Sequence, residues 1–80
     1  DRAEEFLRSK GFCQIRVRSH GDIARIECEP DERRKFFDVQ LIDEISRELV
    51  SYGFLYVCME LSGYRMGSLN KAIAKETANG

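Results

Sequence analysis

The sequence predicts an α+β fold, a two-layer sandwich in which a small sheet carries helices on one face, with the element order α-β-β-α-β. Three patterns predict it. Two alternating arms flank a turn within residues 13–28, an apolar stripe with helical spacing follows in residues 38–52, and a third alternating run occupies residues 54–61. With 42% hydrophobic and 34% charged residues, the 80 residues are expected to form a single domain, 1–80, with a charged surface.

The first helix is expected over residues 3–10. Ala3, Phe6 and Leu7 recur there at helical spacing and form an apolar stripe. Gly11 follows at the position where a left-handed residue commonly closes a helix, so the helix is expected to end there.

The two arms of the hairpin alternate so strictly that side chains of one kind share one face. A turn at His20-Gly21 would put His20 at the tip, in a backbone conformation with positive φ, with a role as a base as the disfavoured alternative. On the polar face this register pairs Arg18 with Ile23, Arg16 with Arg25 and Gln14 with Glu27. On the opposite face it pairs Val17 with Ala24, Ile15 with Ile26 and Cys13 with Cys28.

The later elements are a helical turn, the main helix, the third strand and a short C-terminal helix. Pro30 begins a polar segment that suits one helical turn, and Asp38 is the expected N-cap of the main helix, which Gly53 ends. The apolar stripe of that helix comprises Leu41, Ile42, Ile45 and Leu49. In the third strand, the residues expected to face the helices are Leu55, Val57, Met59 and Leu61, and those expected on the other side are Phe54, Tyr56, Cys58 and Glu60.

Three arginines on the polar face of the hairpin, Arg16, Arg18 and Arg25, form a candidate anion site. Like charges directly opposite each other destabilise a sheet, so the expected Arg16/Arg25 pair requires a compensating anion. Glu27 is one candidate for that anion, and a bound phosphate or carboxylate is the other. Guanidinium groups offer forked donors to oxygen anions, and alternation spaces them about 7 Å apart along one strand. A solvated face with salt bridges is the alternative interpretation.

Composition excludes several classes of function. The formal charge of −1 argues against binding to duplex nucleic acid, and the few aromatic residues on the sheet argue against a single-strand RNA binder. No apolar run or leader predicts a membrane span or signal peptide, so a cytoplasmic location is expected. Cys13, Cys28 and Cys58 lack CxxC spacing and are expected to be reduced thiols, with a Cys13–Cys28 disulfide as the disfavoured alternative. A single histidine without clustered ligands predicts no metal site.

Several motifs occur together along the chain. They are the Gly11-Phe12 step, the Arg16/Arg18 doublet before His20-Gly21-Asp22, Ala24-Arg25-Ile26-Glu27, Gly53-Phe54, and the tail Gly63-Tyr64-Arg65 with Gly67-Ser68-Leu69-Asn70. In this combination, over nearly the whole chain, the sequence resembles the carboxy-terminal domain of the LarE-type ATP-dependent sacrificial sulfur transferases of the PP-loop superfamily.

The resemblance implies a larger enzyme than these residues. Relatives carry an amino-terminal PP-loop domain that uses ATP and Mg²⁺ to adenylate a carboxylate on a pyridinium mononucleotide. A protein cysteine then gives up its sulfur, a step in the synthesis of a nickel-pincer cofactor. The chain, which begins at Asp1 without a methionine, is expected to be the C-terminal substrate-binding and oligomerisation domain, without a cofactor and inactive alone. Its implied partners are the PP-loop domain, a small phosphorylated substrate and further copies of itself.

The resemblance also implies roles for individual residues. Arg16 and Arg18 match arginines that line the phosphate end of the substrate site, and Glu27 matches an acidic position that orients an arginine or helps hold a metal. Arg65 is expected at the same junction or in subunit packing. None of the cysteines matches the sulfur donor. Two alternatives stay open, a regulatory module that binds a small molecule and a purely structural assembly domain.

Overall fold

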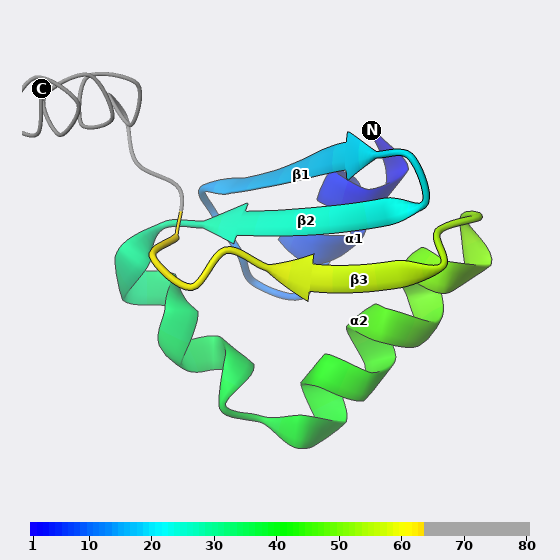
Figure 1. Ribbon diagram of the computed structural model, residues 1–80. Helices are drawn as coiled ribbons and strands as arrows, with labels where there is room; N and C mark the ends of the chain where they lie inside the picture. The colour runs from blue at the N-terminus through cyan, green and yellow to red at the C-terminus, as the bar shows by residue number, and fades with distance from the viewer. Residues whose placement is uncertain (64–80) are drawn as a thin grey trace, which may run out of the picture.

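A helix, a β-hairpin, a 3-10 helix, a second helix and a third strand follow one another in the computed structural model, which describes residues 1–63 (Figure 1). Their bounds are α1 Arg2–Ser9, β1 Ile15–His20, β2 Ile23–Cys28, η1 Pro30–Phe36, α2 Val39–Ser51 and β3 Tyr56–Met59. The predicted α-β-β-α-β order is thereby confirmed. The short C-terminal helix expected from the sequence lies outside the described residues.

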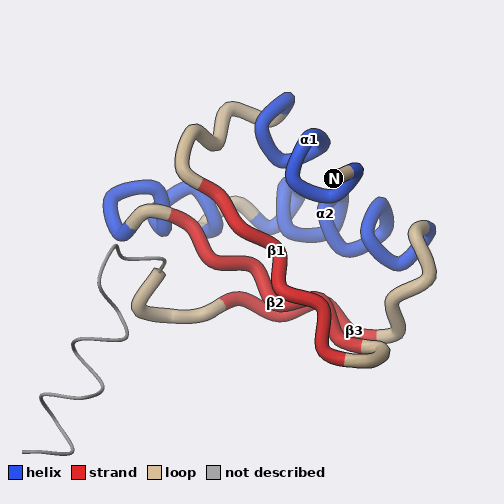
Figure 2. The backbone as a smooth tube through the Cα atoms, turned by 90° about the horizontal axis from the view of Figure 1, so that it is seen from above, coloured by secondary structure: helices blue, strands red, loops and turns tan. Residues whose placement is uncertain are grey.

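The three strands form one sheet in the order β1-β2-β3, so β2 is the central strand. β1 pairs antiparallel with β2, whereas β3 pairs parallel with it. A parallel pair requires a crossover connection, and here η1 and α2 provide it. Figure 2 shows α1 and α2 on the same side of the sheet, which confirms the two-layer arrangement and leaves the other face of the sheet without a helix from residues 1–63.

Both helices begin at aspartates whose side chains cap free backbone N–H groups. Asp1 accepts a hydrogen bond from the Glu4 amide at 2.9 Å, and Asp38 accepts one from the Leu41 amide at 3.2 Å, as the sequence predicts for α2. Gly11 follows the C-cap Lys10 with φ of 102°, a left-handed conformation that favours glycine. Gly11 thus closes α1 as expected, but the helix begins and ends one residue earlier than residues 3–10.

The core lies between the sheet and the two helices. Its buried members are Ala3, Leu7, Phe12, Ile15, Ala24, Ile26, Cys28, Ile45 and Leu49. The rings of Phe12 and Phe36 add an aromatic contact, with centroids 5.0 Å apart. Of the α2 stripe, Ile45 and Leu49 are buried as expected, whereas Ile42 is 41% exposed. No helix within residues 1–63 is long and apolar enough to span a bilayer.

The register of the hairpin differs by two residues from the expected one. The structure pairs Ile15 with Cys28, Arg16 with Glu27, Val17 with Ile26, Arg18 with Arg25, Ser19 with Ala24 and His20 with Ile23. Gly21 takes the left-handed conformation of the turn with φ of 59°, so His20 stays in β1 and the expectation of a positive φ there is wrong. Because side chains alternate with a period of two, this shift leaves each of them on its expected face.

The third strand is shorter than expected, and its alternation holds only for Tyr56–Met59. Val57 and Met59 pack against the core, but Leu55 is 64% and Leu61 is 78% exposed. Phe54, expected on the opposite side, packs against the core instead. At the start of the strand, the amides of Leu55 and Tyr56 both donate to the Asp22 carbonyl, and regular pairing begins at Tyr56, opposite Ile23.

Candidate functional site

The candidate site is the arginine face, which we define as Arg16, Arg18, Arg25 and Glu27 on the side of the sheet opposite the helices. β1 supplies Arg16 and Arg18, and β2 supplies Arg25 and Glu27. The register sets Arg18 directly opposite Arg25 and Arg16 directly opposite Glu27, so the expected Arg16/Arg25 pair is wrong. The three predicted arginines nevertheless share one face of the hairpin.

Glu27 lies between two of the arginines. Its Oε1 accepts a hydrogen bond from Arg18 Nε at 3.3 Å, and its Oε2 accepts one from Arg25 Nε at 3.1 Å. A terminal nitrogen of Arg25 lies 3.0 Å from the same Oε2. The Glu27 side chain is 12% exposed, against 49% for Arg18 and 38% for Arg25. The carboxylate therefore compensates the like-charged cross-strand pair, while both guanidinium groups keep access to solvent.

The arginine face carries an excess of positive charge. Three guanidinium groups and one carboxylate give it a formal charge of +2, in a chain whose total formal charge is −1. Arg25 also pairs in register with Cys58 of β3, whose side chain is exposed. Chemically, such a surface suits a small oxyanion, because guanidinium groups that a neighbouring carboxylate already orients lose little freedom when an anion binds.

A second cluster, not predicted from the sequence, fixes the chain just before β1. The Glu32 carboxylate accepts hydrogen bonds from the amides of Cys13 and Gln14 at 2.9 and 3.0 Å and from Lys35 Nζ at 2.9 Å. Burial opposes ionisation of Glu32, but these hydrogen bonds outweigh it, so the pKa of its carboxyl lies below the usual value. No sequence motif marks this role, because the contact spans 18 to 19 residues.

The three cysteines are all free, as expected. Cys13 and Cys58 are exposed and Cys28 is buried, where burial and the charge of Glu32 raise the pKa of its thiol. The expected Cys13/Cys28 pair is wrong, because Ile15 lies opposite Cys28. Within residues 1–63 no cluster of three or more His, Cys, Asp or Glu side chains is arranged to hold a metal ion. Arg65, expected to support the site, lies outside the described residues.

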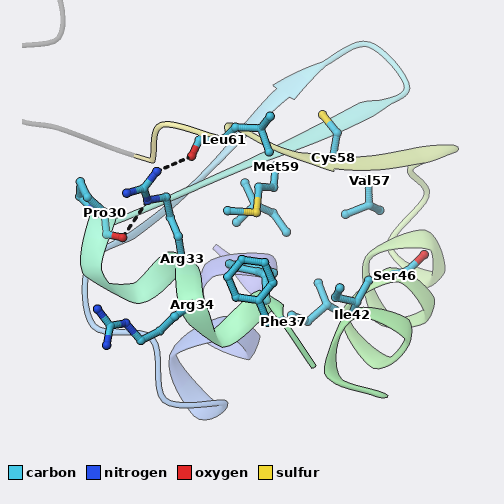
Figure 3. A pocket seen from close by; sticks show the side chains of 13 residues that line it. Pro30, Arg33, Arg34, Phe37, Ile42, Ser46, Val57, Cys58, Met59 and Leu61 are labelled. Carbon is cyan, nitrogen blue, oxygen red and sulfur yellow. Dashed lines mark hydrogen bonds between the residues drawn. The ribbon is translucent and has the colours of Figure 1, made fainter. Parts of the chain in front are cut away.

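An apolar groove lies between β3, η1 and α2, and none of the four residues of the arginine face lines it (Figure 3). β3, η1 and the first half of α2 enclose a cavity of about 620 Å³. The residues that line it are Ile26, Pro30, Arg33, Arg34, Phe36, Phe37, Ile42, Ile45, Ser46, Val57, Cys58, Met59 and Leu61. No motif in the sequence marks this groove, although Phe37 after the polar segment and the exposed Ile42 of the α2 stripe contribute to it.

Two relatives connect the chain to larger proteins. A protein of Lactiplantibacillus plantarum named pyridinium-3,5-bisthiocarboxylic acid mononucleotide synthase is 48% identical over 73 residues, which are 91% of this chain and 26% of that protein. An uncharacterized protein of Synechocystis is 40% identical over 74 residues, 92% of this chain and 28% of that protein. No family model matches the chain. The resemblance to the LarE-type proteins is confirmed, and the chain spans about a quarter of the length of these relatives.

Proposed function

We propose that this chain is the C-terminal substrate-binding domain of a LarE-type, ATP-dependent sulfur transferase, in which Arg16, Arg18 and Arg25 hold the phosphate of a pyridinium mononucleotide. The observation that carries the proposal is the formal charge of +2 on the arginine face. The name of the Lactiplantibacillus relative specifies a mononucleotide, which carries a phosphate group of opposite charge.

The chemistry of the face fits a phosphate monoester. Such a group carries close to two negative charges at neutral pH and offers oxygens that accept forked hydrogen bonds from guanidinium groups. Glu27 holds Arg18 and Arg25 through their Nε atoms. A phosphate above the sheet would therefore meet terminal N–H groups in a fixed orientation. Each hydrogen bond to a charged group contributes about 1.5–3 kcal/mol.

The remaining steps are assigned to the rest of the protein. A PP-loop domain outside these residues would bind ATP and Mg²⁺ and carry out the adenylation, and the sulfur-donating cysteine would lie there too. This chain would position the substrate phosphate and contribute to homo-oligomer contacts, with Arg65 in a supporting role, in a cytoplasmic enzyme. Alone it is expected to hydrolyse no ATP and transfer no sulfur.

Binding to the 80-residue chain tests the phosphate contact directly. We expect a pyridinium mononucleotide to bind at least tenfold more tightly than its nucleoside, measured by isothermal titration calorimetry, and Arg18→Ala to remove the difference. The matched control is Arg47→Ala, which changes an exposed arginine on α2, in the opposite layer of the sandwich. Equal affinity for nucleotide and nucleoside would instead favour a regulatory module that does not recognise the phosphate.

Activity of the protein at its natural length provides a second test. The double variant Arg16→Ala/Arg18→Ala is expected to raise KM for the mononucleotide at least tenfold, because the loss of even one charged hydrogen bond costs about 10- to 100-fold. Arg47→Ala is again the control and is expected to leave KM unchanged.

A purely structural role of the arginine face is the second candidate, and the position of Glu27 between Arg18 and Arg25 favours it. If the ion pairs of Arg18 and Arg25 with Glu27 serve only to hold β1 against β2, the double variant would lower thermal stability and leave KM at the wild-type value. That combination of results would refute the phosphate-binding proposal and support the structural one.

A further inference from the structure

We infer that the apolar groove between β3, η1 and α2 binds a hydrophobic segment from the part of the protein that lies outside these 80 residues. The inference shares with the proposed function only the premise that the chain is one domain of a longer protein. It does not depend on what the arginine face binds, because the groove lies at the edge of the sheet and on the side of the helices (Figure 3).

The groove exposes large apolar side chains next to one another. Phe37 is 92% exposed, Leu61 is 78% exposed and Ile42 is 41% exposed, and all three line the same cavity as the half-buried Met59 and Val57. Single exposed apolar residues are common, but a contiguous apolar patch with a concave centre is typical of a protein contact. At about 620 Å³, the cavity is large enough to take several apolar side chains of a docked segment.

One edge of the groove is an unprotected strand. β3 pairs with β2 on one side only, and no strand from residues 1–63 pairs with its other side. Natural sheets protect such edges with charged residues, proline or a covering element. Residues 53–59 contain neither charge nor proline. β3 is short, with four residues, which limits how much pairing it offers, but neither charge nor proline in it opposes contact with a covering segment.

The lengths of the relatives favour a covalently attached partner. The 73 matched residues are 26% of the Lactiplantibacillus protein, which is therefore about 280 residues long, so about 200 residues lie outside the matched part. A tethered segment has an effective concentration in the millimolar range, far above that of a second copy or a separate protein. Arg33 and Arg34 lie at the rim and none of the lining residues within 1–63 is acidic, so the segment is expected to carry a carboxylate near η1.

Arg33 already serves to hold the rim in place. Its Nε donates to the Pro30 carbonyl at 2.8 Å and its terminal nitrogen donates to the Leu61 carbonyl at 2.9 Å (Figure 3). The first bond lies within η1, and the second joins η1 to the residues after β3, so two sides of the groove are linked before anything binds. A preformed groove lowers the entropic cost of docking.

Thiol labelling tests the inference with a matched pair of probes on α2. Ser46 lines the groove, whereas Ser51 at the end of the same helix does not. Ser46→Cys and Ser51→Cys are each introduced with Cys13 and Cys58 changed to Ser, into the 80-residue chain and into the protein at its natural length. Labelling rates with a maleimide are then measured by mass spectrometry.

We expect the labelling rate at position 46 to fall at least tenfold in the natural-length protein, and the rate at position 51 to stay the same. Phe37→Glu in the natural-length protein should restore labelling at position 46, while Val39→Glu, at an exposed apolar residue outside the groove, should not. Equal rates at position 46 in both proteins would overturn the inference. Protection of position 46 that grows with the concentration of the 80-residue chain would overturn it in favour of a second copy.

The same variants separate this inference from the proposed function. Labelling reports on the groove whether or not the mononucleotide binds, and titration with the mononucleotide reports on the arginine face whether or not the groove is covered. Protection at position 46 together with no phosphate preference would leave the docking surface in place and refute only the phosphate site.

Discussion

Glu27→Gln is the change that distinguishes most sharply between a closed salt-bridge cluster and a face that holds an anion. The substitution keeps the size of the side chain but removes the charge that lies between Arg18 and Arg25. Two partly exposed ion pairs contribute about 0.2–1 kcal/mol each. The uncompensated Arg18/Arg25 cross-strand pair adds a cost of similar size, so we expect a loss of about 1–2 kcal/mol in total.

Thermal unfolding followed by circular dichroism measures this loss. For a domain of this size, 1 kcal/mol shifts Tm by about 4–8 °C, so Glu27→Gln is expected to lower Tm in sodium chloride by about 5–15 °C. In sodium phosphate of equal ionic strength, the anion replaces the missing carboxylate. At ten times its dissociation constant, phosphate would restore about 1.4 kcal/mol, so we expect the variant to gain more stability from phosphate than the wild type does.

The control for this comparison is Glu29→Gln, at an exposed glutamate whose side chain makes no capping hydrogen bond at η1. Its Tm is expected to stay near the wild-type value in both salts. If Glu27→Gln were as stable as the wild type, the ion pairs would contribute nothing. If it were destabilised but gained no more from phosphate than from chloride, the arginine face would not hold an anion, and the reasoning would be refuted.

Two further predictions concern stability. Hydrogen bonds hold the pKa of the Glu32 carboxyl below its usual value. The ionised carboxylate therefore stabilises the fold at neutral pH, and this stabilisation is lost as the pH falls through the pKa of the folded state. In urea titrations we therefore expect Glu32→Gln to be less stable than the wild type at pH 7 and the difference to shrink at about pH 3; a constant difference would contradict this. Gly63→Ala is expected to cost more than about 2 kcal/mol, because φ is 82° and the new Cβ would lie 2.5 Å from the Cys28 carbonyl. Gly21→Ala, with φ of 59° but open space, should cost less, and equal losses would mean that the contact at Gly63 relaxes.

The sequence was sufficient for those features that depend on local periodicity. The apolar stripe of α1 and the Asp38 cap of α2 follow from residues close to one another along the chain, such as Asp38 and Leu41, whereas the Asp1 cap of α1 was not predicted. The face on which each hairpin residue lies follows from alternation. It is the same in the expected and the observed register, because the two registers differ by two residues. The turn was expected at His20-Gly21 but lies at Gly21-Asp22. Both pairs contain the glycine that a tight turn favours, so only the pairing of the strands shows which two residues form the loop.

Features set by contacts between distant residues were not predictable in the same way. Phe54 packs inward and Leu55 outward at the point where the Asp22 carbonyl holds the entrance of β3, a contact across 33 residues. The Glu32 cluster and the groove likewise depend on how η1 folds against β1 and β3. For the candidate site, alternation was enough to bring three arginines to one face, but which of them Glu27 contacts depends on the register.

The mixed sheet has a consequence for the order in which the protein folds. Every residue of β3 pairs with a residue of β2 that lies 33 positions earlier, whereas the hairpin pairs begin with His20 and Ile23, three positions apart. Bringing β3 to β2 closes a loop of 33 residues, which costs about 2 kcal/mol more in chain entropy than closing the hairpin turn. β1 and β2 are therefore expected to meet within microseconds, while β3 arrives last and detaches first. Its amide protons should exchange fastest among those of the sheet, which makes the edge that bounds the groove the part of the sheet most easily remodelled.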